Sequence, residues 1–191
     1  MSFLVLGNAP NALEARRAFL GKSGLLLSGA AVALLAGQEA LAKGGKSGAS
    51  DVRILNTALG AELEAIAAYE VGAKSGLLQK PVLDLAVTFQ GHHKQHADIL
   101  AQTIAKLGGK PVSAKDQYSF PTDTLKTQAD VLRFAAMLEK GAVSAYLGAV
   151  PVFHNSDLAK AAASILGDEA MHWAVLRNAL GEVPVPSAFM A

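Results

Sequence analysis

The sequence predicts an all-α protein in which four long helices pack as one bundle. Apolar residues make up 51% of the chain and aromatic residues only 6%, a balance that favours packed helices over sheets. After residue 50, glycine and proline divide the chain into four long stretches with apolar residues at helical spacing. A chain of 191 residues can bury one good core, so we expect a single domain after removal of a leader.

The ends of the predicted helices carry residues that start or stop helices. Pro81 is favoured in a first turn, and Asn155 and Ser156 are good capping residues. Glycines such as Gly181 commonly follow the last turn of a helix. The predicted helices cover about residues 51–74, 81–108, 127–150 and 156–181.

The segment 109–126, between the second and third predicted helices, is polar and contains proline. It is longer than the turn between the first two helices. A connection of this length can cross a bundle from end to end, which a simple up-and-down bundle does not require. We therefore expect the third helix to begin at the opposite end of the bundle from where the second helix finishes.

Residues 1–42 are predicted to be a cleaved export signal. Arg16-Arg17 precede the uncharged stretch 24–37, and Ala40-Leu41-Ala42 offers small residues for cleavage. The arginine pair followed by Phe19-Leu20 resembles a twin-arginine signal. That resemblance implies passage through the twin-arginine export machinery and cleavage near Ala42. The mature protein is then expected to be periplasmic or otherwise exported.

An N-terminal membrane anchor is the alternative reading of this leader. Its uncharged stretch of 14 residues falls short of the roughly 20 that a membrane-spanning helix needs. We therefore expect no stable membrane span after processing. The predicted organisation is a signal over 1–42, a flexible N-terminus over 43–50 and the bundle over 51–191.

Charge and cysteine content exclude several kinds of partner and ligand. Removing residues 1–42 takes away three basic and two acidic residues, which leaves a mature chain without net charge. Without a basic excess there is no electrostatic footprint for nucleic acid. The chain has no cysteine, so any metal site must use oxygen and nitrogen ligands.

The two halves of the predicted bundle share a spacing of polar and aromatic residues. Glu62 precedes Tyr69 by seven residues, and Glu139 precedes Tyr146 by the same step. Around the later histidines, the segment 92–100 parallels the segment 168–176, so that His92-His93 align with Asp168-Glu169. Amphipathic helices resemble one another in Ala and Leu, but matching polar residues at core positions indicate two duplicated helix pairs.

Ionisable residues interrupt the apolar stripe of every predicted helix. A carboxylate buried alone is strongly unfavourable, and no lysine or arginine occupies these inward positions. A bound metal would balance the charge, and residues three apart on a helix place carboxylate and imidazole side by side. The predicted metal ligands are Glu62, His93, His96, Glu139, Glu169 and His172.

The sequence Glu169-x-x-His172, with Glu139 and Tyr146 before it and the Pro-Ser-Ala-Phe ending at 186–189, resembles the ferritin-like superfamily. Within it, the chain is similar to exported bacterial ferritin-like domain proteins over about residues 50–190. This resemblance implies a ferritin-like four-helix bundle with a long crossover from the second to the third helix. It also implies two metal ions, held by one glutamate from each of two helices and a Glu-x-x-His pair from each of the others.

The chain departs from that pattern at His93, which stands where the family's other pair has glutamate. Three carboxylates carry one less negative charge than four, so we expect an asymmetric site. One metal ion is the alternative to two. Iron is expected first and manganese next, with zinc or copper as further alternatives.

The predicted function is a reaction with oxygen or peroxide, as iron oxidation or as defence against oxidative stress. Tyr69 and Tyr146 are candidate electron donors, and core packing with a satisfied hydroxyl is the other reading of both. A non-catalytic bundle that holds metal for structure or sequestration is the alternative function. The expected partners are a metal ion and a small oxidant, with a homo-oligomer left open.

Four other polar residues are not predicted as metal ligands. Glu64 and Glu70 fall off the inward stripe and are expected on a solvated face. His92 either donates a hydrogen bond to a metal ligand or is exposed. His154 lies at a predicted turn, where no role is expected.

Overall fold

The computed structural model describes residues 47–190, and all its regular structure within that range is helical. The predicted export signal over 1–42 lies outside the described residues. The prediction of an all-α protein with four long helices is confirmed. The elements are α3 (Ser47–Lys74), α4 (Lys80–Lys106), the 3-10 turn η1 (Thr122–Thr124), α5 (Gln128–Ala149), the 3-10 turn η2 (Val150–Val152) and α6 (Ser156–Ala179).

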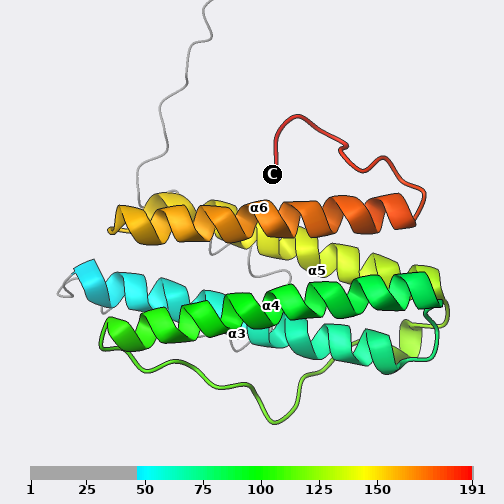
Figure 1. Cartoon of the computed structure of the whole chain (residues 1–191), viewed down its shortest axis with the longest axis horizontal. Coiled ribbons are helices and arrows are strands. Elements are labelled where there is room, and N and C mark those ends of the chain that lie inside the picture. The colour runs from blue at the N-terminus through cyan, green and yellow to red at the C-terminus, as the bar shows by residue number, and fades with distance from the viewer. Residues whose placement is uncertain (1–46, 191) are drawn as a thin grey trace, which may run out of the picture.

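The helices form two pairs, with α3 packed along α4 and α5 packed along α6 (Figure 1). The pairs meet mainly where α3 faces α5, and α4 approaches α6 more sparsely. The connection 107–127 leaves the end of α4, runs the length of the bundle and enters α5 at the opposite end (Figure 1). The predicted long crossover is therefore present.

Local sequence explains where the helices begin and end. Gly76 and Gly108 follow α3 and α4 with φ of 72° and 78°, a left-handed conformation that glycine adopts without steric cost. Thr127 caps α5 through a reciprocal pair of hydrogen bonds with Asp130. The side chain of Asn155 accepts hydrogen bonds from the first backbone amides of α6, as predicted from its capping character.

The first helix begins earlier than the sequence pattern predicts. We expected helix from residue 51 and a flexible segment over 43–50, whereas α3 begins at Ser47 and includes residues 47–50. Residues 43–46 lie outside the described part of the chain. No glycine or proline breaks the backbone between 49 and 59, so the helix continues outward from its buried turns.

Two apolar clusters fill the bundle on either side of a polar middle layer. One cluster is built around Leu59 and Ile104 and includes Tyr146. The other is built around Phe89 and Leu176 and includes Tyr69. Each apolar cluster thus contributes one tyrosine to the boundary of the polar layer. Among the described residues, no helix is long and apolar enough to cross a membrane.

Asp51 ties the start of α3 to the junction between η2 and α6. Its side chain is 2% exposed and accepts hydrogen bonds from the backbone amides of His154 (2.9 Å) and Asn155 (3.0 Å). We expect Asp51→Ala to lower the free energy of unfolding by about 1–3 kcal/mol, because two amide donors lose their acceptor. Chemical denaturation measures this, with the exposed Asp98→Ala as the matched control. An equal loss in the two variants would contradict the proposed tie.

Candidate metal centre

The six predicted ligands come together at the middle of the bundle, and every long helix contributes to them. Helices α3 and α5 provide one glutamate each, α4 provides two histidines, and α6 provides the Glu-x-x-His pair. Five of the six are 3% exposed or less, and the side chain of His96 is 14% exposed. We call this group the inner cluster; its members are Glu62, His93, His96, Glu139, Glu169 and His172.

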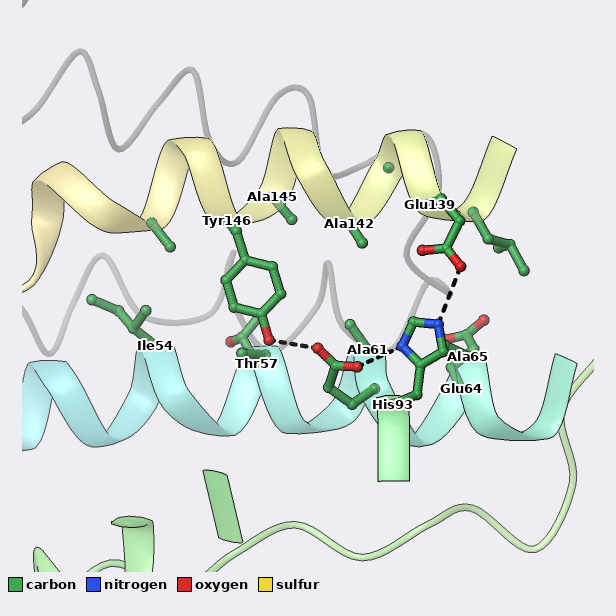
Figure 2. A pocket seen from close by; sticks show the side chains of 15 residues that line it. Ile54, Thr57, Ala61, Glu64, Ala65, His93, Glu139, Ala142, Ala145 and Tyr146 are labelled. Carbon is green, nitrogen blue, oxygen red and sulfur yellow. Dashed lines mark hydrogen bonds and ion pairs between the residues drawn. The ribbon is translucent and has the colours of Figure 1, made fainter. Parts of the chain in front are cut away.

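His93 lies at the centre of a continuous line of polar contacts. Its Nδ1 is 2.8 Å from Glu62 Oε2, and its Nε2 is 3.2 Å from Glu139 Oε1 (Figure 2). Beyond these carboxylates, Tyr146 donates a hydrogen bond of 2.6 Å to Glu62 Oε1, and Tyr69 donates one to Glu139 Oε1. Each tyrosine therefore binds the glutamate of the other helix pair. The repeated Glu-to-Tyr spacing in the sequence produces this reciprocal arrangement between α3 and α5.

The inner cluster offers two overlapping groups of four ligand atoms, and within each group the atoms lie within 4.8 Å of one another. His93 and Glu169 belong to both groups. A carboxylate can bind two cations at once, but a neutral imidazole has a single free lone pair, so His93 can serve only one of them. The two groups are Glu62, His93, His96 and Glu169, and His93, Glu139, Glu169 and His172.

Three buried ligand atoms have no hydrogen-bond partner among the described residues, and their positions show whether the inner cluster suits a metal ion. Within the described residues, these buried orphans are Nδ1 of His96, Oε2 of Glu139 and Oε1 of Glu169. His96 Nδ1 and Glu169 Oε1 lie only 3.1 Å apart, yet they are not aligned as a hydrogen bond. Buried polar atoms are normally satisfied, so atoms that converge without bonding one another fit a shared cation. The donor set of oxygen and nitrogen atoms suits iron, manganese or zinc.

Protons compensate the carboxylates when no metal is bound. Burial opposes charge on His93, but hydrogen bonds to Glu139 and Glu62 outweigh it and raise its pKa to about 11. Burial also lowers the pKa of His96 and His172, but the neighbouring carboxylates outweigh burial and raise both pKa values to about 9. Among the described residues, no lysine or arginine forms an ion pair with the inner cluster. Protonated histidines therefore supply the positive charge that balances the buried carboxylates.

The carboxylates respond unequally to this environment. Burial raises the pKa of Glu169 above its ordinary value, and the charge of nearby Glu62 adds to the effect. Burial also acts on Glu62 and Glu139, but hydrogen bonds from the histidines prevail and lower the pKa of both. Burial and carboxylate charge raise the pKa of Tyr69 and Tyr146 well above that of an ordinary phenol. Both phenols therefore stay protonated and act as donors.

The metal-free protein should lose stability as the pH rises above neutrality. A histidine whose pKa is raised on folding stabilises the fold fully below its unfolded pKa of about 6.5. That contribution fades as the pH rises through about 9 for His96 and His172 and through about 11 for His93. Thermal melting of metal-free protein from pH 6 to 10 measures it. A melting temperature that increases across this window would contradict the assignment.

A small cavity of about 70 Å³ reaches the inner cluster between α3 and α5 (Figure 2). Alanine is its most frequent lining residue, including Ala61 and Ala65 on α3 and Ala142 and Ala145 on α5. Glu62, His93, Glu139 and Tyr146 also line it. The cavity has room for water or a small oxidant, and most of its exposed wall is apolar.

Sequence reasoning missed Asp168. Its Oδ2 lies 3.3–3.4 Å from a ring nitrogen of His92, His96 and His172. The available signal was the spacing of four residues to His172, which puts both on one helix face, and the alignment of Asp168 with His92 in the internal repeat. His92 is 38% exposed, and its Nδ1 lies 2.8 Å from Nε2 of His172, so it contacts a predicted ligand directly.

The remaining polar residues lie outside the inner cluster, at different distances from it. Glu70 is exposed and pairs with Lys74, as expected for a solvated face. Glu64 is half-buried and lines the cavity between α3 and α5, nearer the site than we expected. The backbone amide and ring of His154 contact Asp51.

Comparison with known proteins shows which family has this architecture. The family model described as the ferritin-like domain matches residues 50–182. The crystal structure of a conserved hypothetical protein, Rv2844 from Mycobacterium tuberculosis, aligns with a TM-score of 0.65 and 24% sequence identity. The alignment covers 75% of this chain and 99% of that one, and at this identity it supports the fold alone. No curated protein matches the chain.

Proposed function

Because the chain belongs to the ferritin-like domain family, we propose that its inner cluster binds two metal ions, iron first and manganese next, that react with oxygen or peroxide. The observation that carries the proposal is the pair of overlapping four-ligand groups whose buried atoms include three without hydrogen-bond partners. When bound, ferrous iron supplies the electrons that reduce the oxidant. The biological outcome would be iron oxidation or removal of peroxide.

The residues around the cluster support this chemistry. The alanine-lined cavity between α3 and α5 gives a small uncharged oxidant a route to Glu62 and His93. Burial keeps bulk water away from the ligands, and the line of contacts from Tyr146 through His93 to Tyr69 connects both phenols to the site.

The rate of Fe²⁺ oxidation tests the proposal. Stopped-flow absorbance should show that the metal-free protein accelerates oxidation of added Fe²⁺ by oxygen or peroxide over buffer. Bound metal should be measured on the same preparation by elemental analysis. Metal binding without any acceleration would refute the redox function and leave the metal-binding proposal standing, whereas no bound metal would refute both.

A non-catalytic, mononuclear site is the second candidate, and the position of His93 favours it. The ring sits between Glu62 and Glu139 with both nitrogens facing carboxylates, a place that an imidazolium can occupy instead of a second metal ion. A single ion with a closed coordination sphere would stabilise the fold and do no chemistry. One bound equivalent, a large fall in melting temperature with chelator and no oxidation of Fe²⁺ would establish this candidate.

We propose Tyr69 and Tyr146 as electron donors to the oxidised centre. Each phenol hydrogen-bonds to a predicted ligand, which gives it a direct path to the metal. Reduction of oxygen to water takes four electrons and two ferrous ions supply two of them, so we expect oxygen treatment of the ferrous protein to produce a tyrosyl radical signal in electron paramagnetic resonance. The signal should be absent from the Tyr69→Phe, Tyr146→Phe double variant, with Tyr118→Phe as control. A signal that survives the double substitution would assign the radical to another residue.

Export through the twin-arginine machinery remains part of the proposal and rests on Arg16-Arg17 and the stretch that follows them. Because this route carries folded proteins, the centre could acquire its metal before export. Cell fractionation tests it. The chain should accumulate outside the cytoplasm, and an Arg16→Lys, Arg17→Lys variant should remain inside at full length; equal export of both would refute the route.

A further inference from the structure

A second group of metal-binding side chains lies on the α4–α6 side of the inner cluster. We call it the outer cluster: His92, Asp168 and the Nε2 atoms of His96 and His172. Asp168 Oδ2 lies 3.3 Å from His92 Nδ1, 3.4 Å from His96 Nε2 and 3.3 Å from His172 Nε2. One carboxylate oxygen is thus shared by three imidazoles, and within the described residues Asp168 forms no ion pair with lysine or arginine.

The two clusters share the rings of His96 and His172. In both residues Nδ1 faces the carboxylates of the inner cluster and Nε2 faces Asp168. A cation on the outer side is therefore separated from the inner ligands by the width of an imidazole ring. A neutral ring offers one lone pair at a time, so each ring can serve the outer cluster or the inner cluster, but not both at once.

Exposure decreases steadily from the outer cluster inward. The side chains of His92 and Asp168 are 38% and 24% exposed, that of His96 is 14% exposed, and that of His172 is 2% exposed. Phe89 stacks on the His172 ring with centroids 4.0 Å apart, and the His92 ring also stacks on the His172 ring, with centroids 5.1 Å apart. The outer cluster is thus open to solvent at His92 and Asp168, and ring stacking holds it in place at His172.

From this arrangement we propose that the outer cluster is a capture site, which binds a divalent cation from solution and passes it to the inner cluster. The two faces of the bundle then have different tasks. The α4–α6 side offers a cation the converging ligand atoms of His92, Asp168 and His172, with His96 also in contact with Asp168, while the cavity on the α3–α5 side has room for an uncharged oxidant. The inference rests on the proposed metal-binding function of the inner cluster, and it does not require redox activity.

The capture site is tested first in a protein whose inner cluster cannot hold metal. We expect a Glu139→Gln, Glu169→Gln variant to bind one equivalent of Co²⁺, seen by equilibrium dialysis and by visible absorption bands of the bound ion. Adding His92→Ala or Asp168→Asn should remove that equivalent, while adding His154→Ala should leave it. If the double variant binds no Co²⁺, or if its Co²⁺ survives both added changes, the capture site is refuted.

Loading kinetics in the otherwise unaltered protein provide the second test. We expect His92→Ala and Asp168→Asn to slow the appearance of the inner-site Co²⁺ spectrum about 10-fold, the lower end of the effect of altering groups around a metal, while the final number of bound equivalents stays the same. Unchanged loading rates would mean that the outer residues only orient the inner histidines. Absence of bound Co²⁺ in the unaltered protein would instead refute the proposed metal function of the inner cluster.

Discussion

Replacing Glu169 with glutamine is expected to abolish tight metal binding and the oxidation of Fe²⁺ that depends on it. Glu169 is 0% exposed, and it is the one carboxylate that belongs to both four-ligand groups. The amide keeps the size of the side chain but removes the charge and one anionic oxygen. Because altering groups that merely support metal ligands costs 10–100-fold in affinity, we expect the loss of a shared ligand to reach on the order of 100-fold or more.

Elemental analysis and stopped-flow oxidation of Fe²⁺ measure this effect on the same preparation. Glu70→Gln is the matched control, because Glu70 is an exposed glutamate that pairs with Lys74 across one helical turn. The metal-free Glu169→Gln protein should still fold, since burial already raises the pKa of Glu169 and favours its neutral form. A variant that retains the metal content and rate of the unaltered protein would remove Glu169 from the centre.

The second large effect is expected from His93→Glu. This change supplies a fourth carboxylate between Glu62 and Glu139, where the ring now donates to both. A carboxylate can bridge two cations, whereas an imidazole with a pKa of about 11 must first lose a proton to bind one. We therefore expect the more weakly held of the two inner ions to bind about 10–100-fold more tightly in the variant.

Metal titrations at pH 6 and pH 8 separate the causes. In the unaltered protein the apparent affinity should increase with pH, because metal binding displaces protons from imidazolium groups. His93→Glu should flatten this dependence, and His93→Gln should weaken binding without supplying the bridge. Unchanged affinities and an unchanged pH profile in His93→Glu would show that His93 does not contact the metal.

The fold and the composition of the inner cluster could be predicted from local pattern. Four periodic stretches bounded by glycine, proline and capping residues specify the helices, and the long segment 109–126 specifies the crossover. Buried positions on a helix recur every three to four residues, so Glu169 and His172 could be placed on one inward face without knowledge of their neighbours. The same rule identified Glu62 and Glu139, and the structure brings these groups together.

Contacts between helices could not be predicted in the same way. Periodicity gives the face on which a side chain lies, but not its rotamer or the helix opposite. The binding of Tyr146 to Glu62, the cavity between α3 and α5 and the meeting of three imidazoles at Asp168 all depend on how the helix pairs are set against each other. Asp168 has one partner within a helical turn, His172, but its other two partners, His92 and His96, are about 70–80 positions away in the chain, where local periodicity does not reach.

By itself, the sequence determined that this chain forms a helical bundle and that carboxylates and imidazoles must meet inside it, because both follow from residue type and helical spacing. Only the tertiary structure decided that His93 stands between two glutamates, and that His96 and His172 face the inner ligands with one nitrogen and Asp168 with the other. Those features depend on distances between atoms of different helices, and such distances are fixed only when the helices pack.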